Sequence, residues 1–223
     1  MKNYKQYVID FVEGRVKALD FIALCEENPA VLNWIQSIAP KGKICYKISL
    51  HRNENGLIIG AKEEIVPYDI NIVWESWLRH GTKYDIGNQL NVHTGLSSLM
   101  LEVFPNDGIN VDDTISELFD FFLDVRPNYI GGKDADELIT KLMNELPINL
   151  SKSKRVKLLK EQIKMLFHIE KHKPNWLQSP EWPFSNGKPM RFVSQTKKFN
   201  GDLYGYVFED IDTKEQKTIE QFS

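Results

Sequence analysis

A run of prolines near the C-terminus divides the chain into two kinds of sequence. Pro174, Pro180, Pro183 and Pro189, with Gly187 among them, exclude a helix from this stretch, because proline lacks the backbone N–H that a helix interior needs. Before it, apolar residues recur mainly at helical spacing, and after it aromatic and β-branched residues dominate. We therefore predict an α+β fold, predominantly helical over about 1–173, with a β-module over about 174–223.

The β-module is predicted to be a three-stranded antiparallel meander. Asn200-Gly201 lies between residues 191–196 and 203–209, and an Asn-Gly pair between two such runs indicates a hairpin. A second turn near Thr213 leads into a third strand at 218–222.

The helical part carries recognisable start signals and one further hairpin. Asn28-Pro29 and Asp69 are typical of helix N-termini, and Ser151 is expected to cap a last helix that runs to about Lys173. Between residues 44 and 50 apolar and polar residues alternate as in a half-buried strand, so we predict a hairpin with its turn at 53–56. The polar segment 91–95 predicts a local break in the helix over 85–104. Because the joint at 147–151 is short, we expect one continuous domain over 1–223.

Composition limits the classes of function. Lys and Arg number 28 against 31 Asp and Glu, a net charge of −3, which argues against a dedicated nucleic-acid binder. No apolar run approaches the length of a transmembrane segment, and the first ten residues contain no signal-peptide core. Cys25 and Cys45 provide neither a disulfide framework nor a metal quartet. We expect a cytoplasmic protein with reduced thiols.

Motifs for catalysis and cofactor binding are missing from the sequence. Neither GxGxxG nor GxxxxGK[ST] occurs, and Gly95-Leu96-Ser97-Ser98 lacks the second glycine of a nucleophile elbow. We therefore expect no cofactor and favour a protein that is not an enzyme.

His168 and His172 support the alternative of a metal-dependent hydrolase. They lie four residues apart on the predicted last helix, a spacing that puts two imidazoles on one helix face, as zinc sites require. However, Ile169 stands where a zincin motif has glutamate, and Lys171 and Lys173 would repel a cation. The favoured interpretation is that no metal binds.

The segment 151–173 is also strongly basic. It contains eight Lys and Arg against two Glu, together with an apolar face. Such a helix suits contact with anionic lipid or an acidic surface, or it docks its apolar side on the domain and leaves its lysines in solvent.

The strongest candidate binding segment is the proline-rich strap around Trp176 and Trp182. Tryptophan held rigidly by proline suits protein interfaces, because the indole combines a large apolar area with an N–H donor. The alternative is that both tryptophans pack on the chain's own core. The predicted partner-binding residues are Trp176, Gln178, Trp182, Lys188, Arg191 and Gln195.

The run PNWLQSPEWPFSNGKPMRFVSQ, followed by Tyr204, Tyr206, Phe208 and the closing Glu220-Gln221-Phe222, resembles an uncharacterised family of bacterial cytoplasmic proteins, chiefly from Firmicutes. The last fifty residues are also similar to YwqG-like modules. Some proteins with such modules are suspected of immunity roles beside polymorphic toxins. The resemblance implies no catalytic residue. We therefore expect a non-enzymatic protein that binds another protein, of the immunity type in its most specific form.

Overall fold

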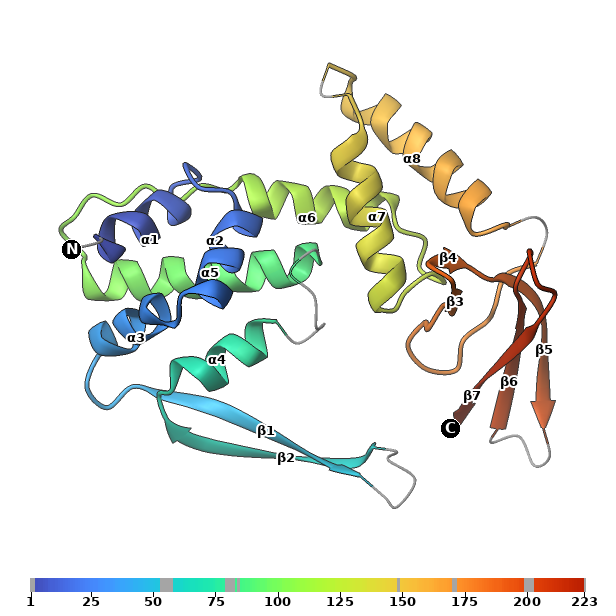
Figure 1. Ribbon diagram of the computed structural model, residues 1–223, viewed down its shortest axis with the longest axis horizontal. Helices are drawn as coiled ribbons and strands as arrows, with labels where there is room; N and C mark the ends of the chain where they lie inside the picture. The colour runs from blue at the N-terminus through green and yellow to red at the C-terminus, as the bar shows by residue number, and fades with distance from the viewer. Residues whose placement is uncertain are drawn as a thin grey trace. The chain divides into compact units, whose positions relative to one another are not determined.

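The computed structural model describes residues 3–52, 58–78, 83, 85–147, 149–169, 172–198 and 203–222. The chain divides into two compact units, the first containing Met1–Lys83 and Gly87–Ser116 and the second Tyr84–Ile86 and Glu117–Ser223. Helices and antiparallel sheets together confirm the α+β class (Figure 1). Boundaries between the units fall inside two helices, after Ile86 and after Ser116, and none falls at the joint 147–151. The single continuous domain stays a prediction.

The first unit is built mainly of helices. They are α1 (Tyr4–Val12), α2 (Ala18–Glu27), α3 (Pro29–Ile38), α4 (Ile70–Trp77) and α5 (Ile86–Val103). Two of the three predicted caps are confirmed: the side chain of Asn28 accepts from the Ala30 N–H at 3.3 Å, and that of Asp69 accepts from the Asn71 N–H at 2.8 Å. These bonds satisfy donors that the first helical turn cannot pair internally. Ser151 stands at the predicted N-cap position before Lys152, but its side chain makes no capping hydrogen bond.

The core of this unit is apolar and closely packed. Phe11 and Phe21 stack with ring centroids 4.2 Å apart, and His93 meets the edge of Phe11 at 5.3 Å. The predicted break at 91–95 is wrong, because α5 continues through it. Its polar side chains find distant partners: the Asn91 amide donates to the Trp77 carbonyl, and His93 Nε2 lies 3.0 Å from the Val12 carbonyl oxygen.

A two-stranded hairpin extends from these helices (Figure 1). It consists of β1 (Ile44–Arg52) and β2 (Ile58–Pro67), paired antiparallel with Tyr46 opposite Ile65. The predicted hairpin is confirmed, and its predicted turn at 53–56 lies outside the described residues. The Tyr68 N–H donates to the Lys43 carbonyl at 2.9 Å and closes the base of the hairpin.

The second unit contains most of α6 (Thr114–Val125), together with α7 (Lys133–Glu145) and α8 (Lys152–Leu166). The predicted end of the last helix near Lys173 is wrong. The helix ends at Leu166, and His168 takes a left-handed backbone conformation with φ of 51°. The buried ring of Phe167 explains this end, since it packs edge-on against Trp182 at 5.4 Å and Phe184 at 6.0 Å.

The predicted meander is confirmed in the second unit. Strands β5 (Arg191–Lys198), β6 (Leu203–Glu209) and β7 (Gln216–Phe222) form an antiparallel sheet in chain order. The predicted Asn200-Gly201 turn lies outside the described residues. A small hairpin of β3 (Phe184–Ser185) and β4 (Lys188–Pro189) precedes the sheet, and its turn residues Asn186 and Gly187 have φ of 50° and 74°.

In the described part of the chain, no helix combines the length and the apolar character needed to cross a membrane.

Candidate functional site

Trp182 lies inside the second unit and not on its surface. Its side chain is only 3% exposed, and the indole N–H donates to the Met190 carbonyl at 2.8 Å. The ring meets Phe167 at 5.4 Å and Phe208 at 5.2 Å, both edge-on. A partner therefore cannot reach this indole while the unit is folded.

Trp176 is half-buried and also packs on its own unit. It stacks on Phe208 at 5.8 Å, lies against Tyr206 at 4.4 Å and donates its indole N–H to the Tyr129 carbonyl at 2.9 Å. Both tryptophans thus pack on the chain's own core, which is the alternative stated from the sequence.

The two predicted glutamines tie the strap to the sheet. The side chain of Gln178 donates to the Phe222 carbonyl at 2.6 Å, and the Gln195 side chain accepts from the Asn175 N–H at 2.8 Å. Both glutamines are exposed, but these bonds already give them a structural task.

Lys188 and Arg191 are exposed and paired with carboxylates. Lys188 Nζ lies 2.6 Å from Asp212 Oδ2, and Arg191 Nη2 lies 2.7 Å from Glu209 Oε1. An exposed pair of this kind costs little to break, so both cations are accessible to a partner. The partner-binding role of the six residues stays a prediction, and the structure leaves Trp182 no direct part in it.

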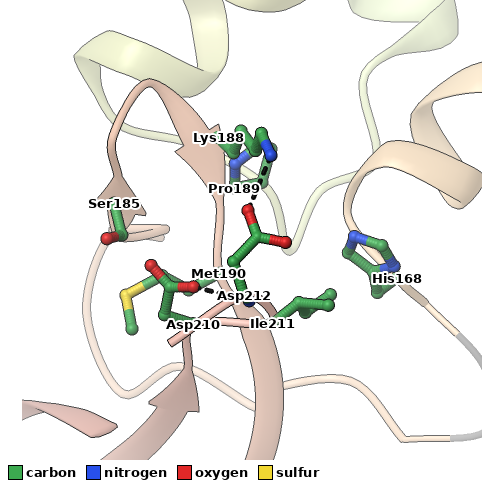
Figure 2. A pocket seen from close by; sticks show the side chains of 8 residues that line it. All are labelled: His168, Ser185, Lys188, Pro189, Met190, Asp210, Ile211 and Asp212. Carbon is green, nitrogen blue, oxygen red and sulfur yellow. Dashed lines mark hydrogen bonds and ion pairs between the residues drawn. The ribbon is translucent and has the colours of Figure 1, made fainter. Parts of the chain in front are cut away.

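A small polar hollow of about 180 Å³ lies beside Lys188 (Figure 2). It brings together residues of types used in hydrolysis, with Ser185 on one side and His168 on the other (Figure 2). The lining residues are His168, Ser185, Lys188, Pro189, Met190, Asp210, Ile211 and Asp212.

The hollow is not assembled for nucleophilic catalysis. A relay would require His168 to bond Ser185 and an acid to orient the imidazole. Instead, a hydrogen bond from Ser185 and backbone N–H bonds from Thr213 and Asp212 lower the pKa of Asp210. The Asp210 carboxylate thus holds the turn between β6 and β7, with Oδ1 2.8 Å from the Asp212 backbone nitrogen and 3.0 Å from that of Thr213.

The helical basis for a metal site at His168 and His172 is also wrong. Both residues follow the end of α8, so they do not share a helix face. Among the residues whose placement is described, no group of three or more His, Cys, Asp or Glu side chains is arranged to hold a metal ion. The hydrolase alternative therefore has no structural observation behind it.

Buried electrostatics in the second unit centre on Asp136. Burial raises the pKa of its carboxyl to about 6, while the guanidinium of Arg126 lowers it and Asp85 adds to the increase. Arg126 Nε lies 3.1 Å from Asp136 Oδ1. A carboxyl that titrates near neutral pH makes the stability of this unit depend on pH.

One face of the β1–β2 hairpin groups four of the exposed large apolar side chains among the described residues. Ile44, Tyr46, Ile48 and Ile65 are 52%, 56%, 61% and 64% exposed, and Tyr46 and Ile65 are direct cross-strand partners. Because side chains alternate along a strand, Ile44, Tyr46 and Ile48 point to the same side. Together with Ile65 they define the hairpin face.

The alternation of apolar and polar residues along β1 was predicted from the sequence, but the exposure of its apolar side was not. A half-buried strand should turn its apolar residues inward, whereas here Cys45, on the opposite side, is the buried residue. Lys47, Lys62 and Glu64 share the side of Cys45. Lys47 and Lys62 are exposed as well, so the charged side of the hairpin is not a buried side, although Cys45 is buried. The row of apolar residues at 44, 46 and 48, opposite a charged row, is the signal that would have identified the hairpin face.

Comparisons of the chain with family models, curated proteins and solved structures gave no match. Function is therefore argued from the residues themselves.

Proposed function

We propose that this chain is a non-enzymatic protein-binding protein and that the hairpin face is its principal contact surface. The observation behind the proposal is that four large apolar side chains on one face of a hairpin are each more than half exposed. Contiguous exposed apolar patches of a few hundred Å² commonly mark interaction sites. A two-stranded hairpin is also marginally stable alone, so a covering partner would stabilise it.

The dimensions of the hairpin face suit an amphipathic helix. Two neighbouring strands span roughly 10 Å with their side chains, about the diameter of a helix. Residues two apart on a strand are separated by about 7 Å, and residues four apart on a helix by about 6 Å. A helix with an apolar stripe along its length can therefore place its side chains between Ile44, Tyr46 and Ile48.

Other contacts would cover this surface less well. A peptide added as a third strand would pair the free backbone groups at the hairpin edge, but it would leave the apolar side chains exposed. Two copies packed face to face would bury the apolar rows, and they would also bring the two Glu63 carboxylates, which lie opposite Ile48, into the interface. Like charges inside an apolar contact are unfavourable, so we favour a partner of different sequence.

An immunity-type role, in which this chain masks a toxin, is the narrowest form of the proposal. It rests on the sequence resemblance of the C-terminal fifty residues. A toxin as the partner that binds the hairpin face would support it, and a partner of any other kind would remove it.

Quantitative affinity capture from the native lysate tests the proposal. We expect the double variant Ile48→Thr/Ile65→Thr to lose at least about 90% of a stoichiometric partner, because threonine keeps the strand preference but removes apolar contact area. The matched control is Lys47→Thr, on the opposite side of the same strand. Equal retention of the partner by wild type and double variant would contradict the proposal, as would dimerisation of the purified chain that the double variant abolishes.

A further inference from the structure

A second concave surface lies within the second unit. It is a cavity of about 520 Å³ between the end of α6, the outer side of α8 and the segment after α8. This volume is within the range of pockets that hold small molecules. The lining residues are Val125, Arg126, Pro127, Tyr129, Lys160, Lys164, Ile169, His172 and Lys173.

The lining is basic, and its one cation with a carboxylate partner among the described residues is Arg126, which pairs with Asp136. Five of its side chains are Arg, Lys or His, and no carboxylate is among the lining residues. Lys160 and Lys164 lie one helical turn apart, so their ammonium groups project from the same side of α8. Neither forms an ion pair with any described residue. Like charges held together at this spacing repel one another, and a bound anion would remove the repulsion.

The opposite wall of the cavity is fixed in position. Arg126 Nε donates to the Ile130 carbonyl at 2.8 Å, and Lys173 Nζ lies 5.0 Å from the centre of the Tyr129 ring. The Tyr129 carbonyl in turn accepts the indole N–H of Trp176 at 2.9 Å. Fixed groups lose little conformational freedom when a ligand binds, which favours affinity.

We infer that this cavity binds a nucleotide, with its phosphates at Lys160 and Lys164 and its planar base on the wall formed by Pro127 and Tyr129. Ammonium groups bind phosphate as point charges, and an aromatic ring provides a stacking surface for a base. The cavity is larger than an isolated phosphate requires, and an isolated phosphate would make no favourable contact with the apolar wall.

The concave shape selects against larger anions. A membrane surface or a nucleic-acid duplex meets a protein over a broad convex or grooved area, whereas these cations line a hollow. Three of the eight Lys and Arg residues of the basic segment 151–173 line this cavity, namely Lys160, Lys164 and Lys173.

Titration calorimetry with the full chain at low salt tests the inference, using ATP and inorganic triphosphate as probes. We expect ATP to bind at least about threefold more tightly than triphosphate. Lys160→Gln/Lys164→Gln should weaken ATP binding at least about tenfold. The control Lys154→Gln/Lys157→Gln removes the same charge from the same helix outside the cavity and should weaken binding less than threefold.

Each contrary result overturns a stated part of the inference. Absence of binding by both probes overturns the site. Equal affinity for ATP and triphosphate overturns the assignment of a nucleotide. Equal weakening by the two double variants overturns the location, because it would show a general effect of charge. Unchanged circular dichroism and melting temperature establish that each variant is folded.

Discussion

Replacing Trp182 by alanine tests whether this tryptophan stabilises the fold or binds a partner. This side chain lies in the core of the second unit, 3% exposed and in contact with Phe167 and Phe208. Trp182→Ala would leave a large cavity between these rings. It would also remove the donor that the Met190 carbonyl accepts at 2.8 Å.

The expected cost follows from these contacts. Truncating a buried tryptophan to alanine costs about 3–5 kcal/mol, and a buried carbonyl left without its donor costs about 1 kcal/mol more. The sum, about 4–6 kcal/mol, is a large part of the roughly 5–15 kcal/mol that stabilises an ordinary domain. Trp182→Phe keeps most of the ring contacts and loses the donor, so its cost should be about half as large or less.

Urea unfolding followed by circular dichroism measures the effect. With a slope of about 2 kcal/mol/M, Trp182→Ala should lower the midpoint by about 2–3 M or prevent folding. Leu177→Ala, at an exposed position of the same strap, is the control and should change the midpoint by less than about 0.5 M. A Trp182→Ala protein with wild-type stability that fails to bind its partner would refute the core placement and restore the strap as an interface.

Three further predictions concern packing and titration. Gly95→Ala should destabilise the first unit by about 1–3 kcal/mol in thermal unfolding, because the new Cβ would overlap the Trp77 indole. Alanine normally favours a helix, so the sign of the effect is diagnostic. Gly60→Ala, with no atom within 4 Å of the new Cβ, is the control. The pKa of Asp136 is about 6 in the folded state against an ordinary 3.8, so the folded state binds more protons than the unfolded state between these pH values. The free energy of unfolding should therefore fall by about 2–3 kcal/mol as pH rises from 4 to 7. Asp136→Asn should flatten this pH dependence, as measured by thermal unfolding across the same range. Burial raises the pKa of Cys25 to about 12, so alkylation followed by mass spectrometry should modify this thiol in urea and leave it unmodified in the native protein at pH 8.

Local chemistry made much of the fold predictable. Asn28-Pro29 and Asp69 begin helices because their side chains bond the first free N–H groups, an effect confined to a few neighbouring residues. The three strands of the meander follow in the same way from short runs with β preference. The Asn186-Gly187 pair indicates a turn just as clearly, but the short strands on either side of it were not predicted because prolines surround them.

Features that depend on distant partners were not predictable. The segment 91–95 remains helical because Trp77 and Val12 supply carbonyls to Asn91 and His93, and sequence spacing does not reveal such pairs. The helix α8 ends early because Phe167 turns into the core, seven residues before Pro174.

The candidate site shows the same division. Sequence identified the tryptophans as chemically distinctive, but only their neighbours decide whether they face a core or a partner. The alternation of the hairpin was also readable, while the side that the helices would cover was not.

Site-specific photocrosslinking at the hairpin tests the central claim most directly. A photoreactive benzoylphenylalanine replaces Tyr46 in one protein and Lys47 in a second, so that the two probes are adjacent in sequence and point to opposite sides of β1. We predict that illumination in native lysate crosslinks one dominant protein to the probe at 46, and that the crosslink lies in a helical segment of that protein. No protein should be crosslinked to the probe at 47. Crosslinking of the same partner with equal yield at both positions, or at neither while the partner still co-purifies, would contradict the claim that the hairpin face is the binding surface.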